Sequence, residues 1–94
     1  MTRLGAPPLP EGLVAFVKRD CPTCELVEGV LADIADRTNI TVYTQDDPNF
    51  PSGLNNLVDD NDLFFSWHHE IETVPTLLRV TSVGETSRVV GWDR

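Results

Sequence analysis

The apolar positions in the first half of the chain predict a strand, a helix and a second strand. Residues 13–17 are all apolar, which is typical of a strand buried on both faces by helices. From residue 22 to about residue 36, apolar positions recur every three or four residues and predict an amphipathic helix of about four turns. Residues 40–44 alternate and predict the second strand, which completes a βαβ unit. The expected inner stripe of the helix is Leu26, Val27, Val30, Leu31, Ile34 and Ala35.

Gly29 interrupts this helical stripe. A glycine inside a helix costs roughly 1 kcal/mol relative to alanine, so a packing reason is expected for it. We interpret Gly29 as a sign of close packing between the helix and the sheet.

The middle of the chain is rich in Pro, Asn and Asp and predicts a long loop over residues 45–61, with a short inward turn near Leu57. A helix capped by Asp60 or Asn61 is expected to follow and to end near residue 70. The residues expected on one face of this helix are Leu63, Phe64, Trp67 and Ile71. The residues expected at its solvent-facing end are His68 and His69.

The last third of the chain predicts a β-hairpin. Residues 73–76 lead into a third strand over residues 77–80, and Gly84 with Glu85 is expected to turn the chain into a fourth strand over residues 86–90. Residues 1–12 contain three prolines and predict an extended lead-in. With 94 residues in total, the chain is expected to form a single domain.

The charge of the chain limits its partners. Seven Lys and Arg residues against fifteen Asp and Glu residues give a net charge of −8, which argues against binding to nucleic acid or to an anionic membrane. Seven of the acids lie between Asp46 and Glu72, where there is no Lys or Arg, so this segment is either a solvated face or a site for a basic partner. The sequence has no secretory signal pattern and no apolar run of about 20 residues, so we expect a cytoplasmic protein.

Two cysteines, Cys21 and Cys24, carry the candidate chemistry. If Pro22 occupies the first helical turn, Cys21 lies at the helix N-terminus, where unpaired N–H groups and the helix dipole favour a thiolate. Lys18 can add a positive charge near that sulfur, and Asp20 opposes it. Cys24 lies one turn further along the same helix face and can close a disulfide with Cys21 by thiol exchange.

Two other roles for a CxxC pair have to be weighed. A closed zinc site needs four ligands, and the sequence has neither a second CxxC nor histidines at zinc-finger spacing, so we expect no metal and no cofactor. A purely structural disulfide is disfavoured, because closing so short a loop constrains the unfolded chain very little.

Three segments together resemble the thioredoxin superfamily, and in particular its small thioredoxin-like and glutaredoxin-like members. They are the apolar strand leading into Cys21-Pro22-Thr23-Cys24, the stretch Ile71-Glu72-Thr73-Val74-Pro75-Thr76, and the Gly84-Glu85 hairpin ending at Gly91. The resemblance covers roughly residues 13–91.

The resemblance implies an α/β thioredoxin fold with a four-stranded mixed sheet in the order 2-1-3-4, flanked by helices, and a cis Pro75 against the cysteines. It also implies a thiol–disulfide oxidoreductase in which Cys21 attacks and Cys24 resolves. The substrate would be a protein disulfide or a small thiol compound, and a separate reductase would complete the cycle. The residues implied in substrate binding are Lys18, Pro22, Thr23, Val74 and Pro75.

The sequence also departs from the family pattern. Thioredoxins carry a buried carboxylate where this chain has Ala15, so we consider Glu25 or Glu28 as a substitute proton acceptor. The C-terminal helix of the family is missing, since the chain ends where that helix would begin. We therefore expect either the first part of a longer chain or a homodimer formed through the uncovered face. A binding module without catalysis, and less so a metal or iron–sulfur carrier, remain as alternatives.

Overall fold

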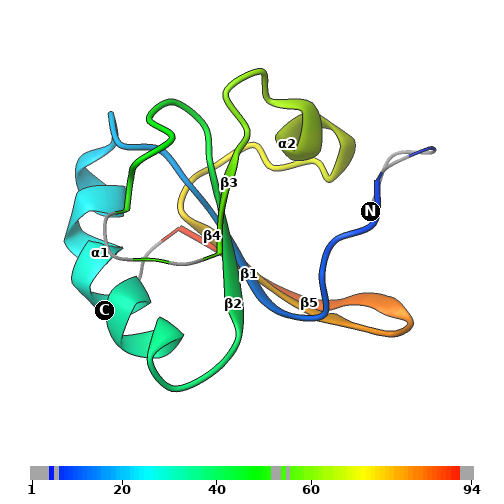
Figure 1. Ribbon diagram of the computed structural model, residues 1–94. Helices are drawn as coiled ribbons and strands as arrows, with labels where there is room; N and C mark the ends of the chain where they lie inside the picture. The colour runs from blue at the N-terminus through cyan, green and yellow to red at the C-terminus, as the bar shows by residue number, and fades with distance from the viewer. Residues whose placement is uncertain (1–4, 6, 52–53, 55, 92–94) are drawn as a thin grey trace.

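The protein is an α/β domain in which one mixed sheet lies between two helices (Figure 1). The computed structural model describes residues 5, 7–51, 54 and 56–91. The sheet has five strands in the order β3-β2-β1-β4-β5. The elements are β1 (Gly12–Val17), α1 (Pro22–Ala35), β2 (Ile40–Thr44), β3 (Leu57–Asp59), α2 (Phe64–His68), β4 (Thr76–Thr81) and β5 (Gly84–Val90).

Strand β1 is the centre of the sheet. It pairs with β2 in parallel and with β4 in antiparallel orientation, and β4 pairs with β5 in antiparallel orientation. The predicted order of four strands is therefore present, but the prediction of a four-stranded sheet was wrong, because β3 adds a parallel edge strand to β2. Strand β3 has only three residues inside a segment rich in Pro, Asn and Asp, so it leaves no periodic pattern in the sequence.

The two faces of β1 hold two separate halves of the core. Val14 and Phe16 pack on one side with Tyr43 of β2, and this cluster also contacts Phe65 of α2. Residues 15 and 17 face the other side, against α1. The four residues of β1 from 14 to 17 are almost fully buried, which confirms the predicted central strand.

Helix α1 meets the sheet with a narrower stripe than the sequence predicts. Cys24, Val27 and Leu31 are buried, whereas Leu26 is 60% exposed. Residues at positions 24, 27 and 31 form one row of the helix, and position 26 is rotated by about 100° from position 27. The interpretation of Gly29 was also wrong, because a Cβ atom added there would meet no atom within 4 Å.

Helix α2 is shorter than predicted and presents a different face. It ends at His68, and its N-terminus is held by the buried side chain of Asp60, one of the two predicted capping residues. Phe65 rather than Phe64 packs toward the core, so most of the predicted inner face points outward. The prediction for His69 was wrong as well: it is buried, and its Nε2 lies 2.7 Å from the carbonyl oxygen of Pro7.

The C-terminal hairpin turns two residues earlier than predicted. Strand β4 ends at Thr81 and β5 begins at Gly84, so Ser82 and Val83 form the turn. Gly84 has a φ of +106°, a backbone conformation that favours glycine. It is the first residue of β5 and does not form the turn itself. Among the residues described, no helix is long and apolar enough to span a membrane. The expected position of a C-terminal helix lies outside the described residues.

Candidate dithiol site

The N-terminus of α1 places Cys21 at the surface of the domain. Strand β1 ends at Val17, a short connection follows, and Pro22 is the first residue of the helix. Cys21 is the N-cap residue, with an extended backbone (φ −149°, ψ 112°), and its carbonyl oxygen accepts the N–H of Glu25 at 3.1 Å. Cys21 is half-buried, which makes it the more accessible of the two cysteines.

Cys24 lies one turn along the helix and is fully buried. It approaches Cys21 to 3.5 Å, and its sulfur accepts the backbone N–H of Lys18 at 3.4 Å. Burial raises the pKa of the Cys24 thiol to about 12; the neighbouring Cys21 and the carboxylate of Asp46 raise it further, while the N–H of Lys18 opposes this rise. Cys24 is therefore a thiol at neutral pH, and Cys21 is the sulfur open to a partner.

The segment before β4 lies against the Cys21 thiol. The Cys21 sulfur is 3.8 Å from the carbonyl oxygen of Val74, and the Val74–Pro75 peptide bond is cis. The carbonyl oxygen of Pro75 accepts the N–H of Gly91, which ties this segment to the end of β5. The fold thus brings together residues that are 53 positions apart in the chain.

The other residues implied in substrate binding contact the cysteines less directly. Lys18 reaches Cys24 through its backbone N–H. Pro22 is exposed and Thr23 is half-buried in the first turn of α1, next to Cys21. Pro75 is buried beside Val74.

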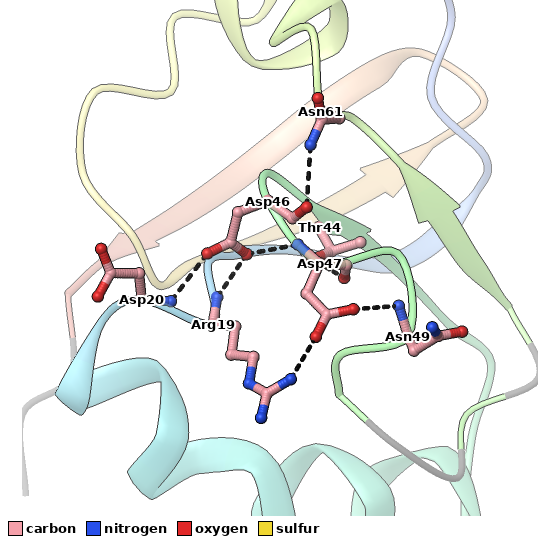
Figure 2. A network of polar contacts seen from close by, with 7 residues as sticks. All are labelled: Arg19, Asp20, Thr44, Asp46, Asp47, Asn49 and Asn61. Carbon is pink, nitrogen blue, oxygen red and sulfur yellow. Dashed lines mark hydrogen bonds and ion pairs between the residues drawn. The ribbon is translucent and has the colours of Figure 1, made fainter.

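The carboxylate of Asp46 holds the connection between β1 and α1, and sequence reasoning missed this role (Figure 2). Its oxygens accept the backbone N–H groups of Arg19 at 2.7 Å, Asp20 at 2.9 Å and Asp47 at 2.7 Å. Partial burial alone would raise the pKa of Asp46, but these N–H groups outweigh it and the pKa lies below its ordinary value. We call these three hydrogen bonds of Asp46 the clamp. Its one signal in the sequence is an acid placed two residues after the second strand.

Asp47 extends the clamp toward Arg19 and Asn49. Its carboxylate accepts the N–H of Asn49 at 2.9 Å and forms an ion pair with Arg19 at 2.5 Å (Figure 2). Glu25 and Glu28 line a polar hollow together with Arg19 and Asp47. The role of Glu25 or Glu28 as a proton acceptor for the cysteines stays a prediction.

No protein-family model matches the chain, and no curated protein does. Within the described part of the chain, His, Cys, Asp and Glu side chains do not gather in groups of three or more that can hold a metal ion. The feature of this site that indicates a function is the arrangement of the two cysteines.

Proposed function

We propose that this protein is a thiol–disulfide oxidoreductase with a thioredoxin fold. The observation that carries the proposal is a pair of free cysteines 3.5 Å apart, of which Cys21 is half-buried and Cys24 is fully buried with a pKa raised to about 12, mainly by its burial. The strand order β2-β1-β4-β5, the position of the pair at the start of α1 and the cis peptide before Pro75 support the fold assignment.

The reaction proceeds by two exchanges. The Cys21 thiolate attacks one sulfur of a substrate disulfide; the substrate S–S bond breaks, a mixed disulfide forms, and the released substrate thiolate takes up a proton. Cys24 then loses its proton and attacks the Cys21 sulfur, which releases the second substrate thiol. The substrate gains two electrons and two protons, and the protein is left with a Cys21–Cys24 disulfide.

A dithiol reductase returns the protein to its starting state by the same exchange in reverse. The electrons pass only between sulfur atoms, so the proposed cycle uses no bound cofactor. The proposed setting is the cytoplasm, where cellular thiol systems keep cysteines reduced. Substrate binding is assigned to Lys18, Pro22, Thr23, Val74 and Pro75, which surround or adjoin the two sulfurs.

The rate of alkylation of each cysteine tests this proposal. We expect iodoacetamide at pH 7 to label Cys21 at least about tenfold faster than Cys24, because the thiolate is the reactive form and the Cys24 thiol is both buried and protonated. Peptide mass spectrometry on the reduced protein measures both rates. In the Cys21→Ser variant, labelling of Cys24 is expected to increase up to the highest pH at which the fold is stable.

Turnover provides the second half of the test. Cys21→Ser should abolish reduction of bis(2-hydroxyethyl) disulfide, a small neutral substrate, whereas Cys24→Ser should accumulate a mixed disulfide with it. Equal labelling of the two cysteines together with no turnover would exclude the oxidoreductase. If a partner protein bound equally well after both cysteines were replaced by serine, a non-catalytic binding module would take its place.

A further inference from the structure

The outward face of α2 is apolar, although a surface helix usually turns its apolar side to the core. Leu63, Phe64 and Trp67 are 45%, 46% and 57% exposed. An exposed group of large apolar side chains on a small domain usually marks an interaction site. We call the set of Leu63, Phe64, Trp67 and His68 the α2 patch.

The aromatic rings of the α2 patch pack against one another. The His68 ring lies 4.5 Å from that of Phe64 and 4.8 Å from that of Trp67, which it meets nearly at a right angle. The Nδ1 atom of His68 donates to the carbonyl oxygen of Phe64 at 2.8 Å, because a carbonyl can only accept. The three rings therefore form one surface and do not act as separate exposed residues.

Polar contacts beneath α2 hold this surface in place. The fully buried carboxylate of Asp60 accepts the backbone N–H groups of Phe65 and Ser66, both at 2.9 Å, and the hydroxyl of Ser66. Arg88 donates to the carbonyl oxygens of residues 69 and 70 at the other end of the helix. A patch anchored in this way loses little conformational freedom when a partner binds.

Leu63 adopts a backbone conformation that is unfavourable for leucine. Its φ is +61° and its ψ is 24°, in the left-handed region that glycine and asparagine adopt more readily. A large exposed apolar side chain thus stands at a position where a small polar one would be better suited. Such strain is found most often at binding and catalytic sites.

A groove runs from the α2 patch to Val74, the residue that the Cys21 thiol contacts. The groove has a volume of about 280 Å³ and reaches Val74, whose carbonyl oxygen is 3.8 Å from the Cys21 sulfur. A chain that lies in this groove would therefore reach the residue that contacts Cys21. The lining residues are Gln45, Leu63, Ser66, Trp67, Ile71, Glu72 and Val74.

Acidic residues lie in and beside the groove, and Arg88, which contacts the end of α2, is ion-paired with Glu85. Glu72 lines the groove and is exposed, and Asp59 and Asp62 are exposed beside α2. No Lys or Arg occurs between Arg37 and Arg79 in the sequence. A basic side chain is the complement of these acids, and an arginine can also stack on the face of Trp67.

We propose that the α2 patch and its groove bind an extended segment of a protein substrate that carries an apolar residue and an Arg or Lys next to its disulfide cysteine. The apolar side chain lies against Leu63 and Trp67, and the basic one lies near Glu72. The proposal rests on the oxidoreductase function and names the class of substrate that the site selects.

Synthetic peptide disulfides test this selectivity. Four symmetrical disulfide-linked peptides would carry Leu-Arg, Leu-Glu, Ser-Arg or Ser-Glu beside the cysteine, and the pre-reduced protein would be mixed with each in a single turnover. We expect the second-order rate constant for the Leu-Arg peptide to exceed that for the Ser-Glu peptide by at least about tenfold, as for a favourable apolar contact plus an ion pair. Bis(2-hydroxyethyl) disulfide is too small to reach the patch and serves as the reference substrate.

Three variants separate the patch from the thiol chemistry. Trp67→Ala should slow the Leu-Arg peptide by about tenfold, as for the loss of a central aromatic contact, and leave the small disulfide unchanged. Glu72→Gln should reduce the preference for arginine by about threefold and weaken its salt dependence. Val83→Ala, a truncation of an apolar side chain that is 87% exposed in the hairpin turn, away from the α2 patch, should change neither rate.

The Leu63→Asn variant distinguishes a loss of substrate binding from a loss of folding. Asparagine suits the left-handed conformation, so this variant should be at least as stable as the parent in urea and still reduce the Leu-Arg peptide more slowly.

If the small disulfide is reduced but all four peptides react alike, or if Trp67→Ala behaves as Val83→Ala does, the docking proposal is wrong while the oxidoreductase stands. A dimer that Trp67→Ala converts to a monomer would also overturn it, since the patch would then bind a second copy. Loss of all turnover in the parent protein would instead remove the function on which the proposal rests.

Discussion

The carboxylate of Asp46, just after β2, binds the backbone that leads into α1. It accepts backbone N–H groups at positions 19 and 20, immediately before Cys21, and at position 47 on its own loop. Arg19 and Asp20 are exposed, but a carboxylate accepts backbone N–H groups more strongly than a neutral group does. Asp46 therefore acts on the dithiol site by positioning the residues that lead into it.

Replacement of Asp46 tests this positioning role. We expect Asp46→Asn to lower the free energy of unfolding by about 1 to 2 kcal/mol, because an amide retains one acceptor oxygen and turns a donor toward the remaining N–H groups. Urea denaturation at pH 7 measures the change. Asp33→Asn is the matched control, since Asp33 only pairs with Arg37 at the surface and its loss should cost no more than about 0.5 kcal/mol. Equal effects of the two variants would contradict the clamp.

Helix α1 contains one residue, Gly29, that lowers the stability of the helix. Gly29 is exposed, has ordinary helical geometry, and has open space where a Cβ atom would stand. The glycine is therefore a cost to the helix that no contact in the described residues offsets.

The Gly29→Ala substitution should raise the free energy of unfolding by about 0.5 to 1 kcal/mol, through the higher helix propensity of alanine and its smaller unfolded-state entropy. Thermal or urea unfolding of the reduced protein checks this. Gly84→Ala serves as the control of opposite sign: it also adds a methyl group in open space, but at a φ of +106°, so it should destabilise the protein. A loss of stability in Gly29→Ala would mean that the glycine has a contact that the fold does not reveal.

Helix α2 shows how tertiary anchoring overrides amphipathic pattern. Phe64 and Trp67 have the spacing of an inner helix face, yet the buried Asp60 and Ser66 take the inner side. A helix of five residues gains little from its own hydrogen bonds, so the side-chain contacts of Asp60 decide its orientation. This orientation is what leaves the α2 patch available to a partner.

The molecule as a whole carries a charge of −8, and several of its carboxylates stabilise the folded state in ionised form. The pKa of Asp47 is lowered by the N–H of Asn49 and by Arg19, and that of Glu85 is lowered by Arg88. The pKa of Asp46 is lowered as well: its burial acts to raise it, but the N–H groups that it accepts outweigh burial.

These lowered pKa values predict a loss of stability in acid. As the pH falls, the unfolded chain binds protons near the ordinary pKa values of 3.8 for Asp and 4.5 for Glu, before the folded protein does. The stabilisation is therefore fully present above these ordinary pKa values. It is lost as the pH falls through the lower pKa values of the folded protein. We expect the urea midpoint to be lower at pH 3 than at pH 7, and the decrease to be smaller in Asp46→Asn. Equal midpoints at the two pH values would contradict this account.

The apolar groove beside α1 is the other feature of the whole molecule. It runs between the helix and the last two strands, and Val30, Ile34, Leu77 and Val89 are among the residues that line it. Val89 is 60% exposed at its edge. The sequence-based expectation of an uncovered face concerns this side of the sheet, and whether a longer chain or a second copy covers it stays a prediction.

Local pattern was sufficient for the β1–α1–β2 unit and for the candidate dithiol. The apolar run of β1, the alternation of β2 and the placement of Pro22 after Cys21 depend on residues that are neighbours in the chain. The boundaries of β2 agree with the prediction at both ends, and that of β1 differs by one residue. The sequence therefore determined which thiol stands at the helix N-terminus.

Tertiary structure decided the features that depend on distant residues. The edge strand β3 exists because β2 offers it a partner, and the clamp of Asp46 exists because the two loops meet. The burial that raises the pKa of Cys24 comes from the packing of α1 on the sheet, and the outward α2 patch comes from the buried Asp60. Chain neighbours set local conformation, but solvent exposure and hydrogen-bond partners arise only when remote segments come into contact.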